Sequence, residues 1–303
     1  MERPRTKQIN CGGGGDDRFS DLPDEVVYDI LCLLKMRDHA RLMVVSKRCR
    51  ELCISNPNLD LNNIVKKSSL SCLNNFVDRL INQRCGHGVK TERLHLCWSF
   101  EGSVDEDQER RRVNTWLQDL GDVAKVYLRF IQCSHRLLDP DQPALALALP
   151  LCNSTSSVVV DAGDAFLILP SSPSSYLATK LKILILYSVR IQKECNFGEL
   201  LSSFKSLETL KLNEISGIKR MSLSSSTSNI EILSIASRGP DHICDIEIQQ
   251  LHKLRDLDLV LFGTTNERLI NEFGRRAFIY DGRLAISKPR VYSSTKTSNC
   301  GAF

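Results

Sequence analysis

Four thiol and imidazole side chains lie close together in the sequence and are the first candidates for chemistry. They are Cys85, His87, His95 and Cys97. Zinc takes four nitrogen or sulfur ligands of this kind, and alternation along a strand places His95 and Cys97 on one face. The spacing matches no common zinc pattern, however, and Gly86 and Gly88 are typical of a helix end. The sequence therefore predicts no metal site.

Other residue types that support catalysis form no recognisable set. A phosphate-binding loop needs Lys and Ser or Thr after its glycines, but the glycine run 12–15 is followed by Asp16 and Asp17 and lies in a flexible leader, residues 1–17. No Ser/His/Asp or Cys/His arrangement stands out among the six histidines. Cys300 lacks the aliphatic neighbours of a prenylation signal. The chain is interpreted as a non-enzyme with no catalytic residue and no cofactor.

Composition and charge exclude several classes of protein. Hydrophobic residues make up 42% and charged residues 25% of the 303-residue chain, which excludes a disordered or a membrane-embedded protein. The net charge of +4, from 40 basic and 36 acidic residues, is too small to indicate a nucleic-acid partner. The longest uncharged run, residues 142–160, contains two prolines and cannot form the helix of about 20 residues that crosses a bilayer. We expect no membrane partner and, at about 150 residues per domain, two folded units.

Twelve cysteines are numerous, and their setting decides their role. The polar N-terminus leads into no apolar segment, so it predicts no secretory signal. Structural disulfides are rare in the reducing cytosol and nucleus, and no Cys-x-x-Cys pair occurs. We therefore expect the chain in the cytoplasm, the nucleus or both, with most cysteines acting as small buried apolar side chains.

Residues 18–56 carry the pattern of three short helices. Pro23 suits the first position of a helix, and the apolar stripe that follows is too wide for a single packing partner. Asp38 is a candidate N-cap of the second helix, and Ser46 begins the third, which ends before Pro57. Because helices this short bury little surface, the module is predicted to dock on something else. The alternative is that the stripe is simply the core of a helical cap.

A helical linker is predicted for residues 57–90, with apolar residues between 70 and 81 on one side of an amphipathic helix. The charged run 105–112 is interpreted as a solvated loop that leads into another helix. Beyond residue 90 the sequence changes to short strands separated by serine-rich or polar loops.

Four segments share one template, with aliphatic residues at positions one, four and six. They begin at Leu181, Leu207, Ile230 and Leu254. Their spacing lies within the 20–29-residue period of leucine-rich repeats, and 42 of the 303 residues are leucine. Weaker copies precede them at 94–96, 126–128 and 158–160. A strand with one apolar edge is stable only when stacked on its neighbours, so a solenoid is predicted over 91–262, whereas 263–303 follow no template and are unassigned.

Three short motifs follow one another in the helical module: Leu-Pro at 22–23, Ile-Leu-x-x-Leu at 30–34 and Ser-Lys-Arg-x-Arg at 46–50. At these separations they resemble an F-box. The following chain is similar to plant F-box proteins with leucine-rich repeats, in a helix at 75–80 and a Trp-to-strand segment at 111–128. This resemblance implies an α/β fold, in which a three-helix F-box is followed by an irregular leucine-rich-repeat solenoid with parallel strands on its concave face.

The resemblance further implies a substrate receptor of an SCF-type ubiquitin ligase. In that family the F-box docks on a Skp-type adaptor and through it on a cullin, while the repeats bind a protein substrate for ubiquitination and degradation. Carried over to this sequence, the adaptor-binding residues are Leu22, Pro23, Ile30, Leu31, Leu34, Ser46 and Arg48. One departure is Cys49, where the family commonly has Trp, and this smaller side chain offers less contact area. A repeat scaffold that binds proteins without entering a ubiquitin ligase is therefore the alternative.

Alternation along the repeats buries template positions four and six and leaves positions three, five and seven on the open face of the strands. The candidate substrate-binding residues on this face are Ile183, Ile185, Tyr187, Thr209, Lys211, Asn213, Asp256 and Asp258, in a row that also holds Ile232, Ser234, Ala236 and Val260. Their mixture of apolar, basic and acidic side chains suits a protein partner better than a phosphate backbone.

Overall fold

The computed structural model divides into two compact units, Met1–Asn56 and Pro57–Phe303. The described residues are 19, 21–62, 70–100, 106–131, 146–148, 151–168, 180–191, 197–218, 220–223, 229–237, 245–248, 253–262, 277–280 and 283–287. The predicted leader, residues 1–17, and Cys300 lie outside these residues.

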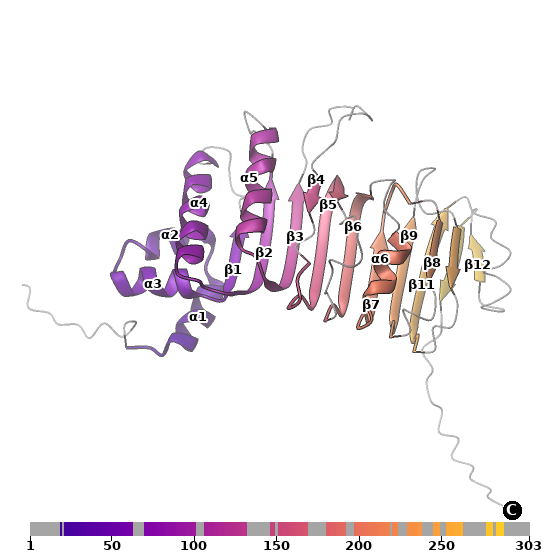
Figure 1. The fold of residues 1–303 in the computed structure, drawn as a ribbon, viewed down its shortest axis with the longest axis horizontal. Coiled ribbons are helices and arrows are strands. Elements are labelled where there is room, and N and C mark those ends of the chain that lie inside the picture. The colour runs from indigo at the N-terminus through magenta and orange to yellow at the C-terminus, as the bar shows by residue number, and fades with distance from the viewer. Residues whose placement is uncertain are drawn as a thin grey trace, which may run out of the picture. The chain divides into compact units, whose positions relative to one another are not determined.

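Three short helices form the first unit: α1 (Asp24–Leu33), α2 (Met36–Leu42) and α3 (Lys47–Ser55) (Figure 1). Helix α1 begins directly after Pro23. Helix α3 begins after Ser46, whose side-chain oxygen accepts a hydrogen bond from the Cys49 amide at 3.0 Å. The three predicted helices are therefore confirmed, and Ser46 is the N-cap of the third.

The predicted N-cap of the second helix is wrong. Helix α2 begins at Met36, and its N-cap is Lys35, whose side chain makes no capping hydrogen bond. Asp38 lies inside the first turn instead, where a carboxylate interacts favourably with the positive end of the helix. Its Oδ1 lies 3.2 Å from Nη1 of Arg41.

The second unit combines helices and strands. Its helices are α4 (Leu70–Gly86), α5 (Glu106–Asp119) and α6 (Phe197–Ser203). Its strands are β1 (Asn58–Asn62), β2 (Thr91–Ser99), β3 (Val123–Ile131), β4 (Ala146–Ala148), β5 (Ser157–Ile168), β6 (Ile183–Ile191), β7 (Thr209–Asn213), β8 (Arg220–Leu223), β9 (Ile232–Ser237), β10 (Asp245–Ile248), β11 (Asp256–Phe262), β12 (Ala277–Tyr280) and β13 (Arg283–Ser287). In the part of the chain that the structure describes, no helix has the length and apolar character to cross a membrane.

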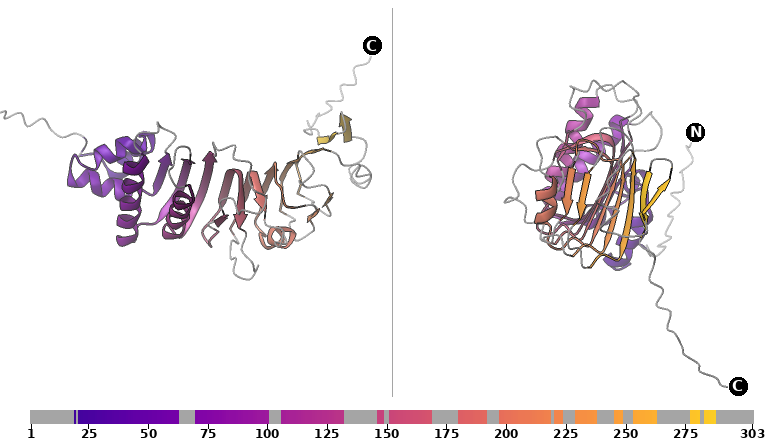
Figure 2. Two further views of the ribbon diagram at one scale, coloured as in Figure 1. Left: turned by 90° about the horizontal axis from the view of Figure 1, so that it is seen from above. Right: turned by 90° about the vertical axis from the view of Figure 1, so that its right-hand side faces the viewer.

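One large sheet dominates this unit, with the strand order β1-β2-β3-β5-β6-β7-β9-β11-β13-β12 and with β4 beside β5. Neighbouring strands from β1 to β11 are parallel, whereas β13 is antiparallel to both β11 and β12. Strands β8 and β10 form a separate parallel pair, and Figure 2 shows this pair and α6 on one side of the large sheet. The expected mixed α/β fold, helices first and a parallel sheet second, is confirmed.

Aliphatic side chains in register form a continuous column through the sheet. Template position four is occupied by Leu59, Leu94, Val126, Val158, Leu184, Leu210, Leu233 and Leu257, each at most 5% exposed. The weaker copies at 94–96, 126–128 and 158–160 are therefore strands in register with the four template segments. Burying each such side chain contributes about 1.5–3 kcal/mol, so this column is a principal source of the unit's stability.

Two segments differ from the sequence interpretation. The predicted helical linker, residues 57–90, begins with strand β1, which pairs with β2 and adds Leu59 and Leu61 to the buried columns. A five-residue strand is too short to be recognised by periodicity alone. The unassigned segment 263–303 contains β12 and β13, which pair antiparallel beyond β11.

A buried polar cluster joins α4, β2 and α5. The carboxylate of Glu109 accepts hydrogen bonds from Asn74 Nδ2 at 2.7 Å and from Trp98 Nε1 at 3.1 Å. Nη1 of Arg112 also donates to this carboxylate, at 3.1 Å. The ring of Trp116 lies edge-on to Trp98, with 4.8 Å between their centroids. Because a buried carboxylate needs such partners, the cluster fixes how α4 and α5 pack.

Glu109 also corrects the interpretation of residues 105–112 as solvated. Its side chain is on the inner face of α5 and is only 4% exposed, whereas the neighbouring Gln108 is exposed. A charged side chain is expected to be exposed, and two of the donors that stabilise Glu109 in the interior lie on other elements, Asn74 on α4 and Trp98 on β2.

We expect Glu109→Ala to lower the free energy of unfolding of the second unit by about 2–4 kcal/mol, because buried donors lose their acceptor. Trp98 and Trp116 are the two tryptophans of the chain, so urea unfolding followed by tryptophan fluorescence reports on this cluster. Glu92→Ala removes an exposed carboxylate and is the control, with an expected change below about 0.5 kcal/mol. Equal midpoints for the two variants would contradict the proposed role of Glu109.

The turn after β7 brings two backbone segments into close contact. Gly217 has a φ of +88°, and a Cβ atom there would lie 2.0 Å from the carbonyl oxygen of Ile191. The Ile191 amide donates to the carbonyl oxygen of Ser216 at 2.8 Å, which holds the two segments together. Left-handed backbone also occurs at Ser188 and Glu214, which follow template position seven on β6 and β7. Consecutive repeats therefore have left-handed backbone at the same template position.

Gly217→Ala is expected to cost at least about 3 kcal/mol of stability, because the added methyl group overlaps the Ile191 carbonyl and the left-handed φ disfavours alanine. Gly121→Ala is the matched control, since Gly121 has a φ of +59° and an added methyl group there would meet nothing within 4 Å. It should cost only about 1 kcal/mol. Thermal unfolding followed by circular dichroism distinguishes the two, and equal losses would refute the steric explanation.

Candidate functional site

The first unit exposes large apolar side chains. Leu33, Val44, Val45 and Val26 have 85%, 78%, 71% and 43% of their surface exposed, and we call them the exposed apolar set. Among the described residues, these are the exposed large apolar side chains, and all four belong to the helical unit. Such a concentration of apolar surface in one small unit makes it the candidate binding site of the described chain.

Helix α1 has two apolar stripes that face different ways. Val27 and Leu31, one turn apart, are completely buried. Val26, Ile30 and Leu33 follow the spacing i, i+4, i+7 on an adjoining strip of the helix, and all three are at least partly exposed. One stripe therefore packs into the core of this unit, while the other is available to a partner.

The apolar residues predicted to bind an adaptor differ in how exposed their side chains are. Leu22, Ile30 and Leu34 are partly exposed, and Pro23 is exposed. Leu31 is 0% exposed, so the prediction that its side chain contacts a partner is wrong for this conformation. The reason is helical phase, because Leu31 lies on the inner stripe of α1.

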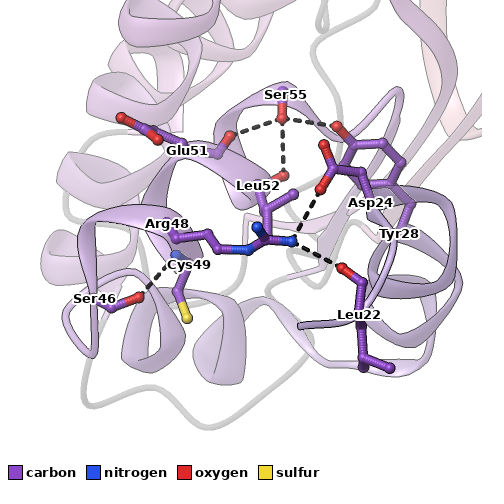
Figure 3. Close-up of polar contacts among 9 residues, drawn as sticks. All are labelled: Leu22, Asp24, Tyr28, Ser46, Arg48, Cys49, Glu51, Leu52 and Ser55. Atoms are coloured by element: carbon purple, nitrogen blue, oxygen red, sulfur yellow. Dashed lines mark hydrogen bonds and ion pairs between the residues drawn. The ribbon is translucent and has the colours of Figure 1, made fainter. Parts of the chain in front are cut away.

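Arg48 and Ser46, also predicted to bind an adaptor, make contacts within the unit (Figure 3). Nη2 of Arg48 donates to the carbonyl oxygen of Leu22 at 2.8 Å and to Oδ1 of Asp24 at 3.2 Å, which ties α3 to the segment before α1. Ser46 caps α3 through the amide of Cys49. Their direct contact with an adaptor stays a prediction, whereas their observed contacts stabilise the unit.

Three further hydrogen bonds lie within this unit. The hydroxyl groups of Tyr28 on α1 and Ser55 on α3 lie 3.0 Å apart, and Ser55 also donates to the carbonyl oxygen of Glu51 at 2.8 Å (Figure 3). Nε2 of His39 lies 2.7 Å from the carbonyl oxygen of Leu31 in the interior. These polar groups are therefore satisfied within the unit.

The cysteines of the described chain are less buried than the sequence predicts. Cys49, Cys53 and Cys97 are buried, but Cys32, Cys72 and Cys85 are exposed, and Cys152 is intermediate. Burial, and next the neighbouring Cys49, raise the pKa of Cys53 from 9.0 to about 11. The Cys53 thiol therefore stays protonated near neutral pH and packs as an apolar side chain.

Sequence reasoning missed the exposed apolar set. A signal was present for Val26 and Leu33, because the stripe of α1 is wider than one packing contact requires. Val44 and Val45 directly follow the short helix α2, where no periodic pattern assigns a face. The exposure of these side chains follows from the packing of α1, α2 and α3, which a sequence pattern does not specify.

The residues predicted to bind a substrate share the open face of the large sheet. Ile183, Ile185, Tyr187, Thr209, Lys211 and Asn213 are partly exposed, and Asp256 and Asp258 are exposed. Template positions four and six between them are buried. The predicted alternation is confirmed, whereas the role of this face in binding stays a prediction.

The four residues first considered as zinc ligands are not brought together as a site. Nδ1 of His95 lies 3.0 Å from Oδ1 of Asp60, and its ring lies 4.7 Å from that of Tyr127. Cys97 is buried, and desolvation raises the pKa of its thiol above 9.0. Within the described ranges, no group of three or more His, Cys, Asp or Glu side chains is placed to hold a metal ion.

Comparison with known proteins identifies the helical unit. Residues 19–72 match the model of the F-box domain. F-box/LRR-repeat protein At3g62440 of Arabidopsis thaliana is 27% identical over 246 residues, which cover 78% of this chain and 52% of that protein. Residues 19–72 are thus an F-box domain, and the chain as a whole is similar to plant F-box proteins with leucine-rich repeats.

Other F-box proteins of Arabidopsis thaliana are also similar. FBD-associated F-box protein At5g18780 is 40% identical over 75 residues, 24% of this chain and 16% of that protein. FBD-associated F-box protein At4g13985 is 24% identical over 254 residues, 80% of this chain and 52% of that protein. The chain thus spans about half the length of the curated relatives that it matches most extensively. No solved structure matches.

We expect Ser46→Ala to destabilise helix α3 of the F-box by about 1 kcal/mol, because the Cys49 amide loses its capping acceptor. Hydrogen exchange followed by mass spectrometry should show α3 amides exchanging about fivefold faster in the variant. Ser46→Asp keeps an acceptor at the N-cap and is expected to exchange like the unmodified protein. Unchanged exchange in Ser46→Ala would contradict the capping role.

Proposed function

We propose that this protein is the substrate receptor of an SCF-type ubiquitin ligase. In this proposal the F-box docks on a Skp-type adaptor and thereby on a cullin, and the second unit holds a protein substrate for ubiquitination and degradation. The observation that carries the proposal is the exposed apolar set, Val26, Leu33, Val44 and Val45, on a unit that matches the F-box model. The receptor itself supplies no catalytic group, and the proposal requires no cofactor.

The size of this surface is in keeping with docking. Burying one large apolar side chain contributes about 1.5–3 kcal/mol, whereas association costs about 4–15 kcal/mol in lost freedom of motion. Several members of the set must therefore be buried together, along with the partly exposed Leu22, Ile30 and Leu34. Loss of two of them should be enough to prevent stable capture.

The second unit is proposed to be an irregular leucine-rich-repeat solenoid whose open strand face binds the substrate. Strands β6, β7, β9 and β11 repeat the same pairing at each template position. Stacked repeats of this kind bury one face and leave the other available along its whole length. A receptor that works through protein contacts is expected in the cytoplasm or the nucleus, without a nucleic-acid or membrane partner.

A repeat scaffold outside any ubiquitin ligase is the second candidate. One observation favours it: Cys49, at the position where the resemblance implies Trp, is only 4% exposed and offers almost no contact area to a partner. A folded F-box that captures no Skp-type adaptor would support this candidate.

We expect Leu33→Asp combined with Val45→Asp to abolish co-purification of a Skp-type adaptor with the full chain, because two carboxylates would be buried without partners. Both side chains are more than two-thirds exposed in the free unit, so far-UV circular dichroism should be unchanged. Leu33→Ile with Val45→Ile keeps the surface apolar and is expected to retain capture.

The buried Leu31→Asp serves as the folding control, for which capture and helical signal should be lost together. Unchanged capture by the Leu33→Asp, Val45→Asp protein would refute docking through the exposed apolar set.

A further inference from the structure

The open face of the large sheet is not uniform, and in its N-terminal part the charged side chains at template positions five and seven are paired with each other, whereas Arg93 and Lys125 at position three are exposed. On β1 and β2, Asp60 and His95 lie 3.0 Å apart, and the His95 ring contacts Tyr127 on β3. On β3 and β5, Nε of Arg129 lies 3.5 Å from Oδ2 of Asp161. Groups already paired in this way lose interactions when a ligand replaces their partners, so Asp60, His95, Arg129 and Asp161 are poorly placed for recognition of a charged ligand.

The middle of the face is apolar. Template position five carries Val159 on β5 and Ile185 on β6, which are register partners. Ile183 and Tyr187 lie two residues to either side of Ile185, so they point to the same face of β6. All four side chains are partly exposed and together offer a contact area for apolar side chains.

Beyond this apolar part, the face carries charges that are not paired with each other. Register pairs place Lys211 of β7 beside Ile185, then Ser234 of β9, then Asp258 of β11. The hydroxyl of Ser234 donates to Asp258 at 3.4 Å, and Asp256 is exposed on the same face of β11. Within the described chain, neither Lys211 nor Asp258 forms an ion pair.

The spacing between neighbouring strands gives the distances between these side chains. Neighbouring strands lie about 4.8 Å apart, so Lys211 is one spacing from Ile185 and Asp258 is about 14 Å from it. An extended peptide advances about 3.3 Å per residue, with residues i, i+2 and i+4 on one side. Its fifth residue therefore reaches Asp258 when its first contacts Ile185, and its third lies within reach of the long Lys211 side chain.

We infer that the section of the open face from β5 to β11 recognises an extended protein segment with a fixed order: an apolar residue, an acidic residue two positions later and a basic residue two positions after that. This inference rests on the proposed function, because it specifies the substrate of the same face. Ile185 and its apolar neighbours contact the first residue, Lys211 pairs with the acidic one, and Asp258 with Asp256 pairs with the basic one.

Two peptides of identical composition test the order. Both are fluorescein-labelled segments on a Ser/Thr background; one carries Leu-x-Glu-x-Lys and the other Leu-x-Lys-x-Glu. Fluorescence anisotropy with the purified full chain, at low ionic strength and up to millimolar protein, gives both affinities. We expect the first peptide to bind at least fivefold more tightly, because the second places like charges opposite Lys211 and Asp258.

Exchanging the two protein charges should reverse this preference. Lys211→Asp with Asp258→Lys leaves the net charge unchanged and is expected to favour the Leu-x-Lys-x-Glu peptide. The matched control is Lys182→Glu with Glu208→Lys, which exchanges an exposed ion pair of 2.8 Å at the start of neighbouring repeats. This control should keep the original preference. Asp258→Asn is a milder variant, expected to reduce the preference without reversing it if the double variant fails to fold.

A separate variant tests the contact between the apolar part of the face and the first residue of the peptide. Ile183→Thr with Ile185→Thr keeps β-branched residues in the strand and is expected to weaken both peptides at least fivefold. Equal affinities for the two peptides, no binding of either, or a preference that the charge exchange leaves unchanged would each overturn the inference. Capture of a Skp-type adaptor, measured on the same preparations, separates these outcomes from a failure of the proposed function.

Discussion

The structure of the second unit depends on one constraint: a strand that is apolar on one side cannot leave that side in water. At template position four, side chains from β1 to β11 meet in register and are almost completely buried. Each strand therefore covers part of the next, and the column breaks wherever a strand is missing. Because alternation assigns the remaining positions to the other side, the same constraint creates the open face.

The F-box differs from the second unit, because it holds more apolar side chains than three short helices can bury. Val27 and Leu31 fill its interior, while Leu33 on the same helix remains exposed. Polar contacts such as that between Arg48 and the carbonyl oxygen of Leu22 stabilise the unit from within. The exposed side chains are thus not needed to fill the interior of the unit, and they remain accessible at its surface.

Periodicity and spacing predicted the helices of the F-box, the repeated strands and the alternation of buried and exposed positions, because these follow from local geometry. The side of α1 that faces the interior was harder to predict. In the sequence, Leu31 and Leu33 belong to one wide apolar stripe, and only the packing of α1 decides which of them is buried. The burial of Glu109 was missed because two of its donors, Asn74 and Trp98, lie on other elements of the fold. Strand β1 was too short to recognise, and Asp38 was misassigned because residue type favours a cap without determining where the helix begins.

The left-handed residues Ser188, within β6, and Glu214, directly after β7, occupy the same template position in consecutive repeats. Since both repeats use the same backbone geometry at this position, one can replace the other without disturbing the register of the sheet. Such units contact mainly their immediate neighbours. Damage at one corner should therefore spread no further than the adjoining turns, which lets loops diverge in sequence while the row of strands is preserved.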